Sequence, residues 1–182
     1  NDTLVGGAGN DDLGAGTGND VLWGGDGDDT LAGDAGNDQL IGDAGNDTFA
    51  SDAGSDVLLG RAGDDTYSFG AGAGYDVVVD AEGANRMRFG TGIRSADVAF
   101  RTNGYDLVAA LADGSRMLVR YAIAAPGDFV PSRIEAFEFD DETLTLAQVQ
   151  ARATDFVSGD SLPSTVTIPS IGARRRRAPI SC

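Results

Sequence analysis

Aspartate recurs at every ninth residue over the first third of the chain, and this spacing is the strongest chemical signal in the sequence. The series is Asp2, Asp11, Asp20, Asp29, Asp38, Asp47, Asp56 and Asp65. From Asp11 on, each aspartate follows a glycine-rich stretch, so carboxylate and turn carbonyl oxygens come together once per repeat. Calcium binds about 6 to 8 oxygen ligands of these two kinds. The spacing therefore predicts a row of calcium sites.

The aspartates belong to a nine-residue unit that repeats seven times without a gap from Gly6 to Ser68, and Asn1 to Val5 are the end of another copy. Glycines in the first and fourth places permit positive φ and a tight turn whose carbonyl oxygens point to one spot. The last three residues hold one apolar side chain between two outward ones, which predicts a very short strand. The glycines expected in the metal-binding turns are Gly7, Gly9, Gly16, Gly18, Gly25, Gly27, Gly36, Gly45, Gly54 and Gly63.

If two repeats form one coil, the aspartates stack in two ladders with rungs about 4.8 Å apart. One ladder contains Asp11, Asp29, Asp47 and Asp65, and the other contains Asp2, Asp20, Asp38 and Asp56. Stacked bare carboxylates repel one another, whereas a calcium ion can bridge adjacent rungs. Three sites per ladder give about six ions. The interior residues form two similar rows, Leu13, Leu31, Phe49 and Tyr67 on one side and Leu4, Leu22, Leu40 and Leu58 on the other, which is a thin core.

The charge of the repeats makes a cation necessary. Residues 1 to 68 contain fifteen aspartates and one basic residue, Arg61, for a net charge of −14, and the 182-residue chain has a formal charge of −16. We therefore expect the repeats to be disordered without a cation and to fold as calcium binds. The acidic balance argues against a nucleic-acid partner, and no apolar run is long enough for a membrane span.

The residues after Ser68 are predicted to cap the repeats. Phe69 and Gly70 shift the period by two residues before a degenerate copy at 71 to 79, in which Asp76 could close one last site. We divide the chain into repeats at 1–79, a β-rich capping region at 80–153 and a flexible tail at 154–182 that could hold a secretion signal. The predicted strands are 85–89, 97–101, 105–111, 115–121 and 133–139, followed by a short helix capped by Thr143 or Thr145.

Residues 1 to 79 resemble the repeats-in-toxin (RTX) family, and the pattern G-G-x-G-x-D-x-U-x is the documented form of its repeat. Residues 70 to about 147 look like the β-rich flank that often follows such repeats. The resemblance implies an all-β fold, a right-handed parallel β-roll of calcium-binding nonapeptides with a β-rich capping region. It also implies export by type I secretion machinery to the exterior or surface of a bacterium, with folding triggered by calcium outside the cell.

By position, the family's carboxylate ligands map onto the eight ladder aspartates, with turn carbonyls completing each site. Some residues depart from the pattern. Ala15 and Ser51 replace the first glycine, and the second is replaced by Asp34, Asp43, Asp52 and Arg61. Turns at these places are expected to be strained or their sites weaker. The tail, with Arg174 to Arg177 and the single cysteine Cys182, differs from what a type I signal leads us to expect.

Other functions remain open. The chain has no His and no Lys, which excludes the usual serine and cysteine triads, the P-loop and Schiff-base chemistry, so we expect no enzyme within it. A carboxylate pair among residues 135 to 142 is possible in the manner of glycosidases, but such clusters are mostly solvated strand ends. The alternatives to a secretion module are a calcium-organised adhesin or surface-layer segment that binds a protein or glycan, and an accessory domain of an upstream secreted hydrolase or epimerase. Because the chain opens within a repeat, we expect it to be the C-terminal part of a longer protein.

The outward side chains at the ninth place of alternate repeats form an apolar stripe of Val5, Trp23, Ile41 and Leu59. Contiguous exposed apolar patches often mark contacts. We expect this face to pack on the C-terminal region, on a second molecule or on an upstream domain, and it is a candidate surface for a protein partner. The stripe predicts that Trp23 and Ile41 are much more buried, in the chain or in its assembly, than Ala32 and Ala50, which occupy the ninth place on the other side.

Overall fold

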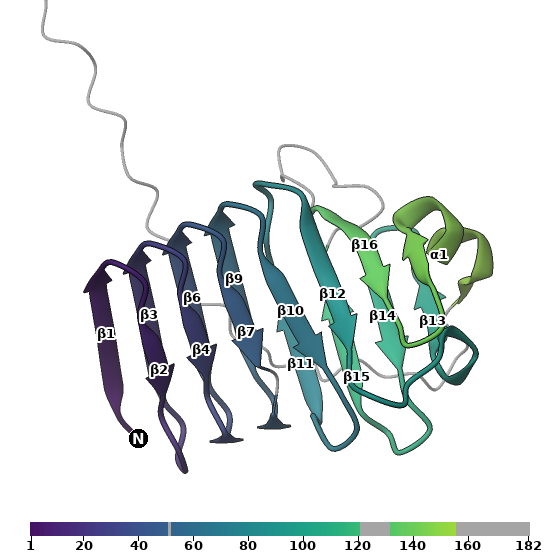
Figure 1. Cartoon of the computed structure of the whole chain (residues 1–182). Helices are drawn as coiled ribbons and strands as arrows, with labels where there is room; N and C mark the ends of the chain where they lie inside the picture. Colours follow the sequence, from purple (N-terminus) through teal and green to yellow (C-terminus); the bar gives the residue numbers. More distant parts are fainter. Residues whose placement is uncertain (51, 121–131, 156–182) are drawn as a thin grey trace, which may run out of the picture.

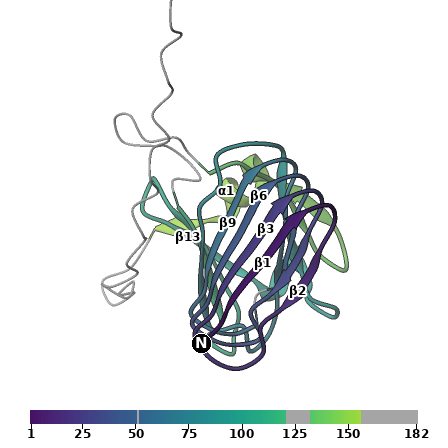
Figure 2. The ribbon, with the colours of Figure 1, turned by 90° about the vertical axis from the view of Figure 1, so that its left-hand side faces the viewer.

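The computed structural model describes residues 1–50, 52–120 and 132–155. In this part of the chain, stacked parallel coils form a β-solenoid of about five turns, which confirms the predicted parallel β-roll. Figure 2 looks along the stack from β1, and the successive coils nearly superimpose. The flexible tail predicted from residue 154 begins instead with a short strand, Thr154–Asp155, that pairs with residues 101 and 102. The rest of the predicted tail, with the arginine run and Cys182, lies outside the described residues.

Two sheets face each other along the solenoid. The larger sheet has nine described strands in the order β1 (Thr3–Ala8), β3 (Val21–Asp26), β6 (Gln39–Ala44), β9 (Val57–Ala62), β11 (Tyr75–Val78), β15 (Arg116–Val119), β14 (Leu107–Ala110), β13 (Ala99–Thr102) and β18 (Thr154–Asp155). The second has seven described strands in the order β17 (Thr143–Thr145), β16 (Ile134–Glu138), β12 (Asn85–Phe89), β10 (Thr66–Phe69), β7 (Thr48–Ala50), β4 (Thr30–Ala32) and β2 (Asp12–Gly14). A two-stranded pair, β5 (Ala35–Gly36) and β8 (Ala53–Gly54), connects turns of successive coils.

Parallel pairing sets the eighteen-residue coil that the repeat predicts. Leu4 pairs with Leu22, Leu22 with Leu40 and Leu40 with Leu58, and the second sheet aligns Leu13, Leu31, Phe49 and Tyr67 in the same way. From Leu22 to Tyr67 these interior side chains are fully buried, and the rings of Phe49 and Tyr67 stack with centroids 5.0 Å apart. The strands of the larger sheet are longer than predicted, because pairing continues past the ninth place into the glycines of the next turn, as between Gly7 and Gly25.

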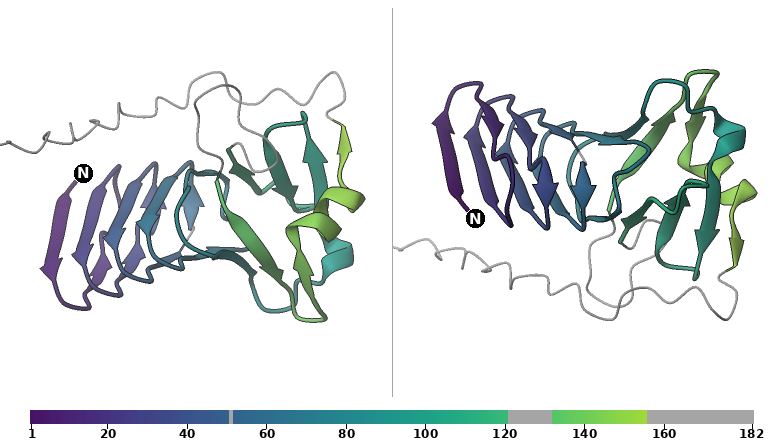
Figure 3. Two further views of the ribbon diagram at one scale, coloured as in Figure 1. Left: turned by 90° about the horizontal axis from the view of Figure 1, so that it is seen from above. Right: turned by 90° about the horizontal axis from the view of Figure 1, so that it is seen from below.

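Both sheets run on from the repeats into the flanking residues (Figure 3). Strand β12 pairs in parallel with β10, and β15 pairs in parallel with β11. Antiparallel hairpins, β13 with β14, β14 with β15 and β16 with β17, then replace the coils. The strand predicted at 85–89 has these bounds in the structure, whereas the stretch predicted at 97–101 begins as a 3-10 helix, η1 (Ser95–Asp97). The division of the chain at residue 79 stays a sequence-based prediction.

The flank closes the end of the thin core with aromatic side chains. Phe89 stacks on Phe139 with ring centroids 4.2 Å apart, and the ring of Phe100 meets that of Phe137 edge-on at 5.8 Å. The helix α1 (Leu146–Arg152) covers this layer with the buried side chain of Val149. Thr145 caps the helix as predicted, because its hydroxyl accepts the backbone N–H of Gln148. An apolar end of the solenoid is thus covered, as solenoid folds require.

The apolar stripe is aligned as predicted but is only half buried. Val5, Trp23, Ile41 and Leu59 pair in register along the larger sheet. Ile41 and Leu59 are 2% and 4% exposed, whereas Trp23 is 37% and Val5 69% exposed. Within the chain the prediction is therefore confirmed for Ile41 and fails for Trp23, which is no more buried than Ala32 or Ala50; burial of Trp23 in an assembly stays a prediction. Trp23 lies in the early coils, far from the flank, where its described contact is the guanidinium of Arg61, 5.7 Å from the ring centroid.

Candidate calcium sites

The aspartates at the sixth place form two hydrogen-bonded ladders, one on each edge of the roll. In each ladder the backbone N–H of one aspartate donates to Oδ1 of the aspartate one coil further on. The bonds run from Asp11 to Asp29 at 2.8 Å, Asp20 to Asp38 at 2.8 Å, Asp29 to Asp47 at 2.9 Å, Asp38 to Asp56 at 2.9 Å and Asp47 to Asp65 at 2.8 Å, with a further bond from Asp2 to Asp20. The two sets of four predicted from the spacing are therefore brought together as predicted.

The second carboxylate oxygen of these aspartates has no partner within the described residues. Oδ2 is buried and makes no hydrogen bond in Asp11, Asp20, Asp29, Asp38, Asp47 and Asp65. From Asp20 onward the ladder aspartates are at most 3% exposed. Leaving a buried acceptor unsatisfied costs about 1 to 3 kcal/mol, and more when the group is charged. Six such atoms in two regular rows therefore indicate a ligand that binds oxygen and repeats with the coil.

The turn glycines divide their roles differently from the prediction. Positive φ occurs at the second and fourth places rather than the first and fourth, for example at Gly25 (118°) and Gly27 (132°). The first-place glycine is needed for space. A Cβ on Gly24 would lie 2.2 Å from Oδ2 of Asp29, and one on Gly42 would lie 2.0 Å from Oδ2 of Asp47. Because the first-place glycine has no side chain, the unpartnered Oδ2 can lie directly against its Cα.

Residues that replace the second-place glycine adopt the same left-handed backbone. The φ angles of Asp34, Asp43 and Arg61 are 63°, 80° and 79°. This conformation costs a residue other than glycine roughly 1 to 2 kcal/mol, so these turns are strained as predicted. The side chains of two of these residues form an ion pair, between the guanidinium of Arg61 and the carboxylate of Asp43. Ser51, which replaces a first-place glycine, lies outside the described residues.

A second ladder at the fifth place was missed in the sequence. Here the side-chain oxygen of one coil accepts the backbone N–H of the next coil, as in Asp28 to Asn10 at 2.9 Å and Asn46 to Asp28 at 2.7 Å. These residues are exposed, unlike the sixth-place aspartates. The signal was present, since the fifth places read Asn10, Asn19, Asp28, Asn37, Asn46, Ser55 and Asp64. This ladder connects the exposed side of successive turns by hydrogen bonds and uses no oxygen of the sixth-place aspartates.

Both inner ladders continue past the slip in the period. The N–H of Asp56 donates to Oδ1 of Asp76 at 3.0 Å, which places Asp76 on the ladder that begins with Asp2. The N–H of Asp65 donates to Oδ1 of Asn85 at 2.8 Å, which adds a residue that the sequence analysis missed. Both steps span twenty residues instead of eighteen, so the two-residue insertion at 69–70 is absorbed within one coil. A search that allowed this insertion would have placed Asn85 at a sixth place.

A sequence model of the RTX calcium-binding nonapeptide repeat matches residues 1–22 and 41–75 in four copies. This chain carries RTX calcium-binding repeats. Between the two matched segments, Asp29 and Asp38 have the same hydrogen bonds and burial as the ladder aspartates of the matched copies, so the coils continue there unchanged. A comparison with curated proteins finds no match. No helix within the described residues is both long and apolar enough to cross a membrane.

The RTX ladders suit calcium by their donor chemistry. The donors are carboxylate oxygens and turn carbonyls, which are hard ligands that calcium prefers. Within the described residues, no three His, Cys, Asp or Glu side chains converge on one point, so a site here would combine few carboxylates with backbone oxygens. Burial, together with the neighbouring charges of Asp65 and Asp29, raises the pKa of Asp47 to about 6. Burial likewise raises the pKa of Asp56 to about 6 and that of Asp65 to about 7. The fold without a cation therefore disfavours these negative charges.

Acid should partly replace calcium as the neutralising agent. The folded pKa values of about 6 to 7 lie above the value near 3.9 of an unfolded aspartate, so the folded chain binds more protons. The free energy of unfolding of the calcium-free protein should therefore rise as pH falls from about 7 toward 4. We expect calcium-free protein to gain strand signal in circular dichroism between about pH 7.5 and pH 5.5, above the sequence pI of about 4.1. Equal strand content at both pH values without calcium would show that burial does not raise these pKa values. At limiting calcium the pH dependence of strand content should reverse, because protons compete with calcium for the same oxygens.

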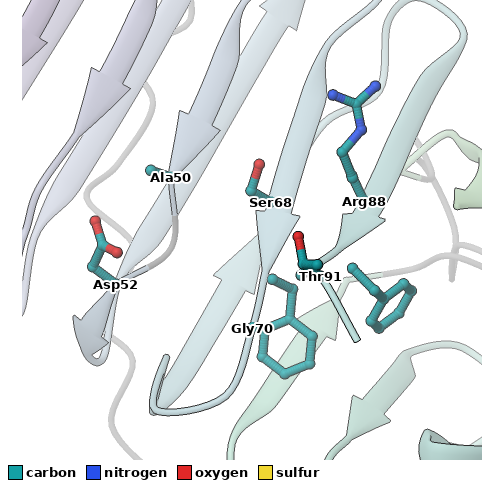
Figure 4. Close-up of a pocket in the computed structure, with 9 residues that line it drawn as sticks. Ala50, Asp52, Ser68, Gly70, Arg88 and Thr91 are labelled. Atoms are coloured by element: carbon teal, nitrogen blue, oxygen red, sulfur yellow. The ribbon is translucent and has the colours of Figure 1, made fainter. Parts of the chain in front are cut away.

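A separate hollow lies on the outer face of the second sheet, where the period slips (Figure 4). It is lined by Ala50, Asp52, Ser68, Phe69, Gly70, Arg88, Phe89, Gly90 and Thr91, with a volume of about 300 Å³. The Nε of Arg88 is engaged with Glu138 at 3.0 Å, and Phe69 and Phe89 are largely buried. The hollow is thus a shallow gap beside the ladder rather than a set of converging ligands.

Proposed function

We propose that the RTX roll binds about six calcium ions along its two inner ladders and folds only when they are bound. The ligands are the carboxylates of Asp2, Asp11, Asp20, Asp29, Asp38, Asp47, Asp56 and Asp65, with Asp76 at the end of one ladder and carbonyls of the turn glycines. The observation that carries the proposal is the set of six buried Oδ2 atoms without a partner, four on one ladder and two on the other. Bound calcium supplies the missing electrostatic partner and bridges consecutive coils.

The charge of the repeats turns calcium binding into a switch for folding. Twelve positive charges from six ions nearly balance the net charge of −14 in residues 1 to 68. Without them the thin core has to overcome repulsion among stacked carboxylates and the conformational entropy of a glycine-rich chain. Metal binding therefore supplies the folding free energy of this module. The RTX roll itself is a structural, non-catalytic element, and the flank acts as the cap of its last coil.

RTX repeats are characteristic of secreted proteins, and we propose that this chain serves type I secretion of a larger protein. At low cytosolic calcium the unfolded chain can thread through a narrow export channel. At the higher calcium concentration outside a bacterium the roll folds, so the carboxylate ladders distinguish the two compartments. The exposed part of the apolar stripe, Val5 and Trp23, remains available for a protein partner.

Small-angle X-ray scattering of the calcium-free and calcium-saturated chain tests the switch. An unfolded chain of 182 residues has a radius of gyration of roughly 45 Å, against roughly 16 Å for a compact one. We expect the calcium-free value to approach the larger figure and millimolar calcium to reduce it strongly, with magnesium at the same concentration as the control for ionic strength. A chain that is equally compact in calcium and in chelator cannot work as the proposed switch.

A further inference from the structure

The ladder through Asp65 ends on an amide rather than a carboxylate. Asn85 takes the sixth place in the next coil, and its Oδ1 accepts the N–H of Asp65 at 2.8 Å. Its Nδ2 donates to the carbonyl of Glu82 at 2.8 Å, so both ends of the amide have partners. Asn85 therefore has no free oxygen like the Oδ2 of the preceding aspartates. The last rung of this ladder has lost one carboxylate.

Asp80 brings a carboxylate back to the same place from a different position of the repeat. It occupies the first place of the repeat that contains Asn85, where most other copies have glycine, and it is 1% exposed. The point where a Cβ of Gly60 would lie is 2.2 Å from Oδ2 of Asp65, 2.2 Å from the Tyr67 hydroxyl and 2.5 Å from Oδ2 of Asp80. Three side-chain oxygens from the roll and its last coil thus converge over Gly60.

The charge of this cluster is not balanced by the described side chains. Asp65 and Asp80 form no ion pair with any arginine in the described ranges, and Oδ2 of Asp65 is buried without a hydrogen bond. The Tyr67 hydroxyl donates to Oδ2 of Asp80 at 2.7 Å, and the N–H groups of Glu82 and Asp47 donate to Oδ1 of Asp80 and of Asp65. These neutral donors reach three of the four oxygens and neutralise neither charge. Two buried carboxylates side by side require a counter-ion or a shared proton.

We propose that Asp65 and Asp80 bind a calcium ion of their own at the end of the roll, in addition to the ions between sixth-place aspartates. Both are hard oxygen donors, and neighbouring backbone carbonyls can complete the coordination of calcium but not of a softer metal. The inference rests on the proposed calcium function and adds a ligand, Asp80, from outside the repeating aspartate positions.

This site joins the roll to its cap. The backbone N–H of Asp80 donates to the hydroxyl of Ser132 at 3.0 Å, and the N–H of Arg133 donates to the carbonyl of Asp80 at 2.7 Å. Ser132 and Arg133 lead into β16, the strand of the flank that pairs with β12 in the second sheet. An ion between Asp65 and Asp80 therefore fixes the last coil at the residue that docks the flank.

Ion counting with Asp80→Asn in the full chain tests the site. Equilibrium dialysis against calcium should give one ion fewer per chain than the wild type, with strands still formed at saturating calcium. Glu82→Gln is the matched control. Glu82 is exposed and lies two residues after Asp80, so the substitution removes the same charge outside the site and should leave the ion count unchanged. An unchanged count in folded Asp80→Asn overturns the site and assigns the pair a shared proton.

Terbium luminescence tests the same site without altering either carboxylate. Terbium replaces calcium and emits when a nearby phenol absorbs, and the Tyr67 hydroxyl lies at this cluster. In a background with Trp23 and Tyr75 both replaced by phenylalanine, because Tyr75 adjoins the ladder residue Asp76, tyrosine-sensitised emission should fall strongly in Tyr67→Phe while the ion count stays the same. Emission that does not fall would overturn the site even if Asp80→Asn fails to fold. If the wild type gains no strands and binds no calcium, the proposed function itself fails, whereas a calcium-dependent fold with an unchanged count removes only this site.

Discussion

Gly36→Ala should prevent the roll from forming a stable stack even at saturating calcium. A Cβ on Gly36 would lie 1.4 Å from the carbonyl oxygen of Gly18 in the preceding coil. Because this contact is with backbone rather than with a flexible side chain, relief requires the two coils to separate. We expect a loss of more than about 4 kcal/mol in the free energy of unfolding, which is exceptional for one methyl group.

The matched control for this variant is Gly9→Ala. Gly9 occupies the same fourth place and has a positive φ of 107°, but an added Cβ would meet nothing within 4 Å. It isolates the cost of the left-handed backbone, which is about 1 to 2 kcal/mol. Urea unfolding of both variants in saturating calcium separates the two effects. Equal losses would show that contact between coils does not determine the glycine at this place.

Asp47→Asn should strongly weaken the affinity of the roll for calcium. Asp47 lies in the middle of its ladder, accepting from Asp29 and donating to Asp65, so it contributes to two proposed sites. The substitution removes the negative charge and replaces one carboxylate oxygen by an NH2 group. If that group takes the place of the buried Oδ2, it leaves a donor where the aspartate had an unpartnered acceptor. We expect the calcium midpoint for folding to rise at least about tenfold, which is about 1.4 kcal/mol of binding free energy.

Asp28→Asn provides the control for charge. Asp28 is exposed at the fifth place, where Asn10 and Asn46 occur naturally in the same ladder. It removes the same formal charge without touching an inner carboxylate, so its calcium midpoint should stay close to that of the wild type. A similar shift in both variants would mean that overall charge, rather than a defined site at Asp47, governs the response to calcium.

The repeat phase was sufficient to predict the architecture of residues 1 to 68. A nine-residue period with one apolar residue between two outward residues fixes which side chain points inward, so the rows from Leu22 to Leu58 and from Leu31 to Tyr67 followed directly. The same phase brought Asp29 and Asp47 into one ladder. The period also predicts the register of the parallel strands, because each coil repeats the register of the one before it.

Details that depend on neighbouring coils were not predictable from the period. Whether a glycine is required for its φ angle or for space depends on what approaches it, and Gly42 proved to accommodate Oδ2 of Asp47 rather than a positive φ. The exposure of Trp23 depends on how far the flank and other segments extend along the roll. Asn85 and Asp80 were missed because a two-residue insertion displaces them from the nine-residue phase, although both occupy regular places once the insertion is allowed.

The flank was predictable in outline because it follows ordinary rules for short strands and hairpins. Asn-Gly and Asp-Gly pairs are typical of hairpin turns. Asn103-Gly104 and Asp113-Gly114 lie on either side of β14, and Gly104 and Gly114 have φ angles of 90° and 99°. The way in which β12 and β15 continue the two parallel sheets was not predicted, since parallel partners far apart in sequence leave no local signal.

We propose that calcium bound to the aspartate ladders folds the roll, and a calcium titration followed by far-ultraviolet circular dichroism is the sharpest test of this. Starting from chelated protein at neutral pH, we expect little strand signal, then a cooperative rise that saturates by millimolar calcium together with binding of about six or more ions. Full strand content in excess chelator, unchanged on addition of calcium, would contradict it.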